Sequence, residues 1–552
     1  MSAGKIKLTL EERERLEIEA HEAAKQINDY MSDVKTASDC ARKVEVHEEE
    51  DLLFPRMRAM VAPLGPMTPN HLETLQPVKI EYSVGGEKHE EEFDAVMIAC
   101  QPVQLEGAMK FTALEKASFD LLRNSWFFTT LVRANKPATE KEQRLSEWGN
   151  WDEALSGNIQ GRREEFNARN PGPYIPDDVA KTYYTVYQQK ENPAPPKTVE
   201  ELQAELEKIR DETLKDKNNN FFLDQPEYVG TPWMSTYFPH FDSAHIEHVW
   251  KMYNLQGFNS TFYIASAMCF ESVLHVYEYG RLLAAKFRDA FSPDKKIAII
   301  GAGPAGLLWS SMYLSDYKNI TILEKSDRYG GKTRTEHHKL SDGTDVVCEL
   351  GTCYLSAAYQ HMVEDFKKAG FFKDSEEIGL GKYNLIRGHK EWRKVIIDGQ
   401  AEKFNAFEKP IRSFESMYRY KALHIEIMGH VRPIPPNWDK IPQKYKDDMR
   451  LTFKEFLIKH NFSLLINSLL YAYQHQGYGK LAEIPALYGL IWVTPEVFHG
   501  ILGNAILGRP SIVFCLKEGW LPIWDKAVES TKGRVKMILN AEVTKITRPG
   551  VD

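Results

Sequence analysis

The stretch Lys296-Ile-Ala-Ile-Ile-Gly301-Ala-Gly303-Pro-Ala-Gly306, in the middle of the chain, decides the fold. Its apolar, β-branched residues predict a buried strand, and the glycines that follow predict a tight turn that opens a helix. Gly301 permits the turn, Gly303 lets the backbone approach a pyrophosphate, and Gly306 lets the helix pack closely against the strand. The pattern therefore predicts a βαβ unit that binds a dinucleotide, with amide groups at the start of the helix facing the phosphates.

An acidic residue at the end of the next strand narrows the choice of dinucleotide. Residues 320–323 form an apolar run that predicts this second strand, and Glu324 follows it directly. A carboxylate at this place can accept hydrogen bonds from ribose hydroxyls, whereas it repels a 2′-phosphate. The sequence therefore disfavours NADP, but up to this point it does not separate FAD from NAD.

A second glycine pair follows in the segment Arg328-Tyr-Gly330-Gly331-Lys332-Thr-Arg334. It resembles the flavin-specific motif of FAD-dependent proteins of the amine oxidase type, in which this loop crosses the pyrophosphate and a basic residue adds positive charge. An ordinary turn with two exposed cations is the alternative interpretation. Glu349-Leu-Gly351 resembles an element of the same proteins in which the backbone near the glycine approaches the flavin. An NAD-linked dehydrogenase is disfavoured, because the glycine pair has no role there.

More distant motifs make the resemblance closer, and the chain is similar to the polyenoic fatty acid isomerases. The similarity covers about 78–134 and 225–552, and it is carried by Thr321-Ile-Leu-Glu-Lys, Gly477-Tyr-Gly479, Ala541-Glu-Val-Thr-Lys-Ile546, Tyr237-Phe-Pro-His240 and Thr261-Phe-Tyr263. One departure stands out. The Gly-Glu that follows Thr-Phe-Tyr in the family is replaced here by Ala265-Ser266, which changes the usual form of that flavin contact.

The resemblance implies a set of site residues and an activity. The flavin N5 would take a hydride from the methylene between two double bonds and return it at another carbon, and no catalytic side chain is identified. Lys382 or Arg387 lies about where the family binds the substrate carboxylate. The apolar segment 484–515 is interpreted as core, or alternatively as the wall of a substrate tunnel. The implied FAD-binding residues are Gly301, Gly303, Pro304, Ala305, Gly306, Glu324, Lys325, Gly330, Gly331, Lys332, Gly351, Val543, Ala265 and Ser266.

The order of the two halves departs from the family. Residues 78–292 resemble the family's late half, and residues 293–552 resemble its early half. A circular permutation explains this order, because exposed loops tolerate such changes. It predicts that the strand over 541–547 lies beside the strand over 78–84 in one sheet. A domain-swapped homodimer, or an error in assembling the sequence, would be the alternative explanation.

These patterns together predict the fold class and the domains. We expect an α/β protein with an FAD-binding, doubly wound Rossmann-like domain and an interleaved α+β substrate domain. Residues 1–77 are predicted as a helical extension. Within 78–292 the sequence predicts substrate-domain strands, a polar insertion over 135–230 and a last flavin-contact helix over 264–287. Residues 293–552 are predicted to hold the βαβ unit and a helical substrate region over 400–530.

Composition excludes several other classes of protein. The 552 residues carry a formal charge of -8, so there is no basic surplus to bind nucleic acid. No apolar run reaches the roughly 18–20 residues of a membrane span, and the N-terminus lacks the apolar core of a signal peptide. Six scattered cysteines indicate free thiols in a reducing cytoplasm. His47 stands beside an acidic run, but the other histidines of a metal site are missing, so no metal is predicted.

Two further functions stay open at this stage. A flavin-dependent amine or amino-acid oxidase would need an aromatic cage that faces the flavin. A flavin-bound scaffold or sensor without turnover would be favoured by a collapsed pocket, whereas a complete tunnel with a buried cation would speak against it. The preferred substrate is a polyunsaturated fatty acid.

Overall fold

In the computed structural model, the residues whose structure is described all fall within Ala62–Asp552. The described residues are 75–135, 147–149, 158–164, 166–167, 181–191, 198–216, 223–340, 343, 345–371, 378–379, 395–397, 400–402, 408–429, 434–466, 469, 473, 476–498, 513–516, 518–548 and 550–551. Apart from its last three residues, the predicted extension over 1–77 lies outside this set, and so does the segment around His47.

A parallel sheet of five strands forms the centre of the described structure. Its order is β10 (Thr261–Tyr263), β3 (Ala95–Ile98), β11 (Lys296–Ile300), β12 (Asn319–Leu323) and β20 (Val535–Ile538). Four of the strands are almost wholly buried and apolar, as expected for a parallel sheet that is covered on both faces, whereas the edge strand β20 is partly exposed. Strands β3 and β10, which come from 78–292, lie on one side of β11, the strand that precedes the glycine turn. The two halves of the chain therefore build one domain.

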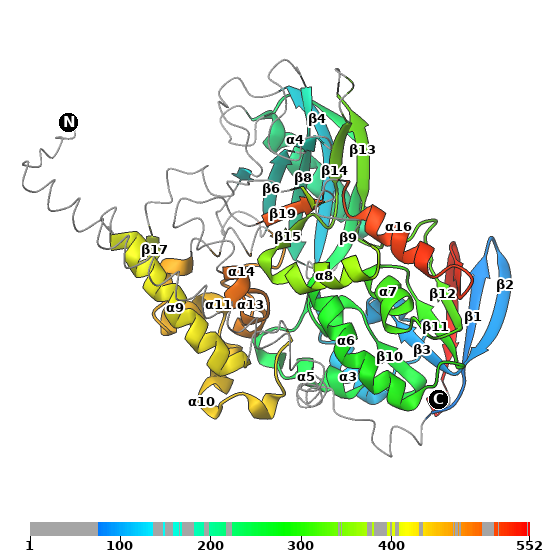
Figure 1. Ribbon diagram of the computed structural model, residues 1–552. Coiled ribbons are helices and arrows are strands. Elements are labelled where there is room, and N and C mark those ends of the chain that lie inside the picture. Colours follow the sequence, from blue (N-terminus) through cyan, green and yellow to red (C-terminus); the bar gives the residue numbers. More distant parts are fainter. Residues whose placement is uncertain are drawn as a thin grey trace, which may run out of the picture. The chain divides into compact units, whose positions relative to one another are not determined.

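The predicted contact between distant strands is present. Strand β21 (Ala541–Thr547) pairs antiparallel with β1 (Val78–Val84), which in turn pairs with β2 (Glu87–Phe93). Figure 1 shows β1 and β21, at opposite ends of the colour scale, next to one another. In this register Ile80 lies opposite Ile546, and both are buried. The pairing that the permuted order predicts is thus confirmed, while the permutation itself stays a prediction.

Helices cover the parallel sheet directly after the glycine turn. Helix α7 (Pro304–Leu308) continues as the π-helix η5 (Trp309–Tyr313), and both pack against α6 (Val273–Ala290). The contact is close at Gly280, where a Cβ would overlap the ring of Tyr313. Helix α6 begins later than predicted, because Ser272 caps it by accepting a hydrogen bond from the His275 amide. Part of 264–272 forms a short 3-10 turn instead of helix.

An antiparallel sheet of five strands stands beside the glycine turn. Its order is β5 (Glu147–Gly149), β6 (Asn158–Glu164), β8 (Lys181–Glu191), β4 (Arg123–Asn135) and β9 (Asp224–His240). Helix α4 (Val199–Lys215) covers one face, where Leu202 and Leu206 pack on Phe128. The polar segment 135–230, interpreted from its composition as an insertion, thus supplies strands that are integral to this sheet.

Further helices and strands surround the two five-stranded sheets or connect their strands. Helices α9, α11, α13 and α14 fall within the region 400–530 for which helices are predicted. The bounds are α3 (Ala113–Phe119), α5 (His248–Asn254), β13 (Thr335–Lys339), β14 (Asp345–Glu349), β7 (Phe166–Asn167), β15 (Tyr354–Ser356), α8 (Gln360–Lys368), β16 (Ile378–Gly379), β17 (Val395–Ile397), β18 (Gln400–Glu402), α9 (Glu408–Met428), α10 (Gln443–Lys446), α11 (Phe453–Lys459), α13 (Ala486–Trp492), α14 (Pro495–Phe498), β19 (Val513–Leu516) and α16 (Leu521–Ser530).

Two sequence predictions concern thiols and membranes. Within the described residues, Cys100, Cys269, Cys348 and Cys353 take part in no disulfide bond. None of the described helices combines the length and the apolar character that crossing a bilayer requires.

Candidate functional site

The glycine turn after β11 has the conformation that the sequence predicts. Gly301 has a φ of +106°, which disfavours any other residue, and its amide donates to the carbonyl of Leu323 at 2.8 Å. A Cβ at Gly306 would overlap the carbonyl oxygen of Gly301. Helix α7 can therefore begin close to the end of the strand only because both residues are glycine.

The second glycine pair packs directly on this turn. The Gly330 amide donates to the carbonyl of Ala302 at 2.8 Å, and a Cβ on Gly331 would stand 2.9 Å from the Cα of Gly303. The guanidinium of Arg328 holds the loop from behind by donating to the Gly331 carbonyl at 2.7 Å. The two loops thus form one backbone-lined wall that no side chain could enter without displacing it.

Gly351 belongs to the same wall. A Cβ at this position would overlap the carbonyl of Lys332, so β14 and the second glycine loop approach one another at a residue without a side chain. Gly351 and the backbone of the loop border the same cavity. Its predicted role, a close approach of backbone to the cofactor, fits this geometry.

Glu324 directly follows β12, at the position where the sequence predicts a carboxylate that binds the ribose hydroxyls. Its carboxylate accepts a hydrogen bond from the Ala302 amide at 2.8 Å, and its other oxygen accepts from the Ser326 amide and hydroxyl at 2.8 and 2.7 Å. These donors fix the carboxylate beside the glycine turn. Burial, together with the nearby charge of Glu324, raises the pKa of the Cys100 thiol to about 12, so that this thiol stays protonated.

Strand β21 closes the cavity next to Glu324. The amide of Ala541 donates to the carbonyl of Glu324 at 2.8 Å, and Val543 borders the cavity two residues further on. Lys325 pairs with Glu542 at 2.8 Å, but both side chains are more than half exposed. Such a pair contributes little stability, and it places Lys325 at the rim instead of inside the site.

Lys332 makes an ion pair across the halves of the chain. Its ammonium lies 2.8 Å from Glu271, whose carboxylate also accepts from the Phe238 amide at 3.1 Å and the Ser266 hydroxyl at 3.0 Å. The ammonium also stands 5.3 Å from the ring centroid of Tyr237. Sequence reasoning identified Lys332 and Ser266 but missed Glu271, the residue that joins them.

One cavity of about 1090 Å³ connects these parts. Gly306 and Gly330 do not border it, and they act by letting the wall behind it pack closely. Lys382 and Arg387, the predicted anchors for a carboxylate, lie outside the described residues. The predicted residues that border the cavity are Gly301, Gly303, Pro304, Ala305, Glu324, Lys325, Gly331, Lys332, Gly351, Val543, Ala265 and Ser266.

From the glycine wall the cavity extends over the antiparallel sheet into an aromatic chamber. The chamber is lined by Phe127 and Thr129 of β4, Thr185 and Tyr187 of β8, Trp233 and Tyr237 of β9, and Tyr478. Cross-strand pairing places Thr129 between Tyr187 and Trp233, so these side chains share one face of the sheet. None of the described residues of 484–498 borders the cavity, and most of those from 484 to 497 are buried in the core instead.

Two tyrosines of this chamber, Tyr237 and Tyr478, are neutral and pack against one another. Tyr237 and Tyr478 stack with their ring planes 13° apart, and the Tyr237 hydroxyl donates to the carbonyl of Gln476 at 3.1 Å. Burial raises the pKa of both hydroxyls well above the usual range. The chamber therefore offers aromatic faces and hydroxyl groups, and Lys332 and Glu271 supply opposite charges at its junction with the glycine wall.

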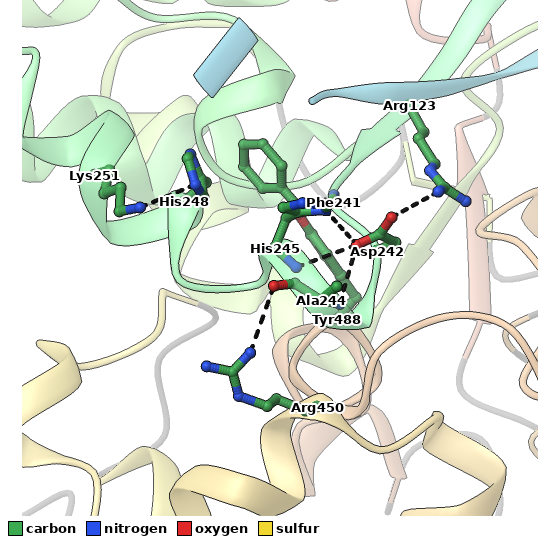
Figure 2. Close-up of polar contacts among 9 residues, drawn as sticks. All are labelled: Arg123, Phe241, Asp242, Ala244, His245, His248, Lys251, Arg450 and Tyr488. Carbon is green, nitrogen blue, oxygen red and sulfur yellow. Dashed lines mark hydrogen bonds and ion pairs between the residues drawn. The ribbon is translucent and has the colours of Figure 1, made fainter. Parts of the chain in front are cut away.

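A polar cluster at the end of β9 holds this sheet in place (Figure 2). Asp242 pairs with Arg123 of β4 at 2.6 Å and with His245 at 2.7 Å, and it caps the turn by accepting from the Ala244 amide. Burial alone would raise the pKa of Asp242, but these partners hold it below its usual value. Because all of its members bond to one another or to the backbone, we assign the cluster a structural role.

Comparison with known proteins agrees with the predicted fold. Residues 299–369 match the family model for an NAD(P)-binding Rossmann-like domain. The polyenoic fatty acid isomerase of Ptilota filicina is 24% identical over 294 residues, which cover 51% of this chain and 56% of that protein. The L-amino-acid oxidase of Crotalus adamanteus is 27% identical over 185 residues, covering 33% of this chain and 34% of the oxidase. The chain spans about half the length or less of these relatives.

Solved structures of the same kinds are also similar. A fatty acid isomerase from P. acnes that produces CLA has 20% identity and a TM-score of 0.31, with 45% of this chain and 52% of that chain covered. Putrescine oxidase with bound putrescine has 15% identity and a TM-score of 0.29, with 44% and 50% covered. The predicted resemblance to FAD-dependent proteins of the amine oxidase type, and the α/β Rossmann-like fold class, are confirmed by the family model and the curated relatives.

Proposed function

We propose that this chain binds FAD and isomerises double bonds of polyunsaturated fatty acids. The observation that carries the proposal is that the glycine wall and the aromatic chamber border the same cavity, which has a volume of about 1090 Å³. A cofactor along the wall would thus present its reactive end to a space of a size suited to a second molecule. The relatives that share the motifs include a fatty acid isomerase.

The residues of the wall fit FAD. Gly303 and Gly331 bring two stretches of backbone together, and their amide groups suit a pyrophosphate. Glu324 suits the ribose hydroxyls, and Val543 lies beside it on β21. An NAD site needs only the first glycine loop, whereas the contact between the two loops favours a flavin dinucleotide. When it is bound, the flavin supplies reversible acceptance of a hydride.

The chain itself would bind, orient and shield the substrate. The aromatic rings of Phe127, Tyr187 and Tyr237 offer an apolar surface along which an unsaturated chain can lie. The ion pair of Lys332 with Glu271 fixes the junction between this surface and the glycine wall. For the substrate carboxylate we propose Lys382 or Arg387 as the binding cation.

An amino-acid or amine oxidase is the second candidate. The aromatic chamber favours it, because Tyr237, Tyr478 and Trp233 form the kind of aromatic surround that such an enzyme would need. An L-amino-acid oxidase is also among the relatives. A scaffold without turnover is disfavoured, because the cavity is open and a cation borders it.

One set of measurements separates these functions. The purified protein is expected to be yellow, and it should convert linoleic acid into a product with conjugated-diene absorbance without forming peroxide. A colourless protein that does not take up added FAD would contradict the cofactor proposal. A yellow protein that makes peroxide from amino acids or amines, and no diene, would make it an oxidase.

The carboxylate anchor has its own test. Lys382→Ala and Arg387→Ala are expected to raise the KM for linoleic acid while the flavin content stays unchanged. The methyl ester of linoleic acid is the matched control, because it lacks the charge. An equal rise in KM for acid and ester would remove both cations from the proposed anchor.

A further inference from the structure

Gln101 is a buried side chain without a partner at the edge of the cavity. It is 5% exposed, and neither its Nε2 nor its Oε1 makes a hydrogen bond among the described residues. The Gln104 amide faces the side chain in a capping-box arrangement, but it donates to the backbone carbonyl of Gln101 at 2.9 Å. An unsatisfied buried amide costs roughly 1–3 kcal/mol, so it is expected where a ligand completes it. The backbone of Gln101 is satisfied separately, because its amide donates to Gln104 Oε1 at 3.2 Å. The side-chain amide of Gln101 is thus the polar group of this residue that lacks a hydrogen bond among the described residues.

The position of Gln101 assigns it to one part of the cavity. It follows β3, whose end packs against the glycine turn: a Cβ on Gly301 would lie 3.4 Å from the amide nitrogen of Cys100. Cys100, Gln101 and Glu324 all border the cavity. Gln101 therefore stands near the glycine turn, at the same edge of the parallel sheet as Glu324.

The segment after Gln101 adds a second constraint. It runs through the 3-10 helix η1 (Pro102–Leu105) and then contacts β21, where the Ile546 amide donates to the carbonyl of Ala108 at 2.7 Å. Gln104, Leu105 and Val543 border the cavity as well. Gln101 thus lies between the glycine turn and β21, in the half of the cavity that holds Glu324. A ribose bound at Glu324 would carry its base in this half.

The chemistry of a carboxamide fits a purine base better than a phosphate. It has no charge, and it offers one acceptor and two donors side by side. Adenine presents an amino donor next to a ring-nitrogen acceptor, and glutamine pairs with that edge through two hydrogen bonds. The terminal torsion of glutamine is broad, so that a small rotation suffices to turn the amide toward the cavity.

We propose that Gln101 recognises the adenine of the bound dinucleotide through its side-chain amide. This inference rests on the proposed binding of FAD, and it adds a residue that selects the base. It predicts that the loss of the amide weakens binding of any ligand that carries adenine. Ligands that have only the pyrophosphate should be unaffected.

The test uses the full chain, stripped of its cofactor and shown to regain FAD. Calorimetric titration with ADP and with inorganic pyrophosphate compares the unchanged protein with Gln101→Met, which keeps the length of the side chain and removes its polar atoms. We expect ADP to bind about tenfold more weakly to the variant, and pyrophosphate to bind equally well. Gln203→Leu is the matched control: it changes a glutamine of α4 that bonds to Glu207 and does not border the cavity.

Each outcome decides a separate question. Unchanged ADP binding in Gln101→Met, or an equal loss for ADP and pyrophosphate, would overturn the role in base recognition, the latter because it indicates support of the glycine turn. If Gln101→Met does not fold, Gln101→Leu replaces it, since it also removes the polar atoms without adding charge and should also weaken ADP more than pyrophosphate. If the unchanged protein binds neither FAD nor ADP, the proposed function itself fails.

Discussion

The glycine wall and the aromatic chamber share one cavity, but they are built in different ways. The wall is made of backbone, and its shape depends on residues that have no side chain, such as Gly303, Gly331 and Gly351. The chamber is made of large side chains on β4, β8 and β9, such as Phe127, Tyr187 and Tyr237. The first depends on short motifs, whereas the second depends on how distant strands pair.

From this difference we infer that the wall determines binding of the cofactor and that the chamber determines selectivity for the substrate. At Gly306, Gly331 and Gly351 the wall tolerates almost no change, because an added Cβ would meet backbone atoms that cannot move aside. A chamber of side chains can change one ring or hydroxyl at a time while the sheet beneath it stays intact. We therefore expect substitutions in the wall to remove the cofactor and often the fold, and substitutions in the chamber to change the substrate or the rate.

The largest effect is expected for Gly306→Ala. The new Cβ would overlap the carbonyl of Gly301 and stand 3.1 Å from a methyl group of Ile299, so the strand and the helix must separate. We expect a loss of at least about 3 kcal/mol in the free energy of unfolding and no bound flavin. Urea denaturation and the visible spectrum measure the two effects.

Gly303→Ala is the matched control for that change. Its φ is -75°, and a Cβ there would lie at an ordinary 3.7 Å from the Cα of Gly331. The variant should keep its stability and still lose flavin, because the methyl group occupies the place of the phosphates. Equal stability of both variants would contradict the claim that close backbone packing makes the wall less tolerant of substitution than the chamber.

The wall could be predicted from the sequence for the same physical reason that makes it intolerant. Gly301, Gly306 and Glu324 act within one βαβ unit, so that their spacing in sequence fixes their spacing in space. The partner strand of β21 could be predicted as well, from the order of motifs alone, and the pairing of Ile80 with Ile546 confirms it.

The chamber could not be predicted, because its members come together only through long-range pairing. Tyr187 lies in a polar segment that composition indicates as an insertion. It nevertheless pairs directly with Thr129, because its strand β8 is the neighbour of β4 in the sheet. Glu271 is not among the site residues that the motifs imply, and its role depends on Lys332, 61 residues away. Gln101 could be found only by accounting for each buried polar group.

Acid should destabilise the fold through buried histidines that do not border the cavity. Burial lowers the pKa of His240, His275 and His424 to about 4, from an ordinary value near 6.5. Between these values the unfolded chain binds protons that the folded protein excludes, so the free energy of unfolding falls as the pH drops from about 6.5 to 4. Each histidine contributes about 3 kcal/mol at most, whereas no histidine is among the described residues that border the cavity.

His424 offers the cleanest test of this acid dependence. Its Nε2–H donates to the carbonyl of Leu490 at 2.9 Å, and this bond ties α9 to the buried helix α13. His424→Gln keeps a donor but cannot titrate, so its urea midpoint should fall less steeply between pH 6.5 and 4 than that of the unchanged protein. An identical pH profile would mean that His424 does not carry the acid sensitivity.

Glu324→Gln should have a smaller effect, confined to the cofactor. The amide cannot accept on both sides, so the Ser326 and Ala302 amides and the ribose hydroxyls compete for one oxygen. We expect FAD to bind about tenfold more weakly, by roughly 1.4 kcal/mol, with little change in stability. Glu542→Gln is the control: Glu542 also borders the cavity, but it is more than half exposed and pairs with Lys325 at the rim. Its affinity for FAD should stay within about twofold; a comparable loss there would move the ribose contact to the rim.

The smallest effect is expected in the chamber, for Tyr237→Phe. The change removes the hydroxyl, which donates to the Gln476 carbonyl and also interacts with the Tyr478 hydroxyl, and it keeps the ring that faces Lys332 and Phe127. A net hydrogen bond is worth about 1 kcal/mol, so kcat/KM should fall about fivefold while the flavin content and its dissociation constant stay unchanged. Tyr228→Phe is the matched control: its hydroxyl bonds to Asp211 on α4, and Tyr228 does not border the cavity. That variant should keep full activity. If Tyr237→Phe released the flavin instead, Tyr237 would belong to the wall, because only a group that holds the cofactor in place can weaken its binding without changing the stability of the fold.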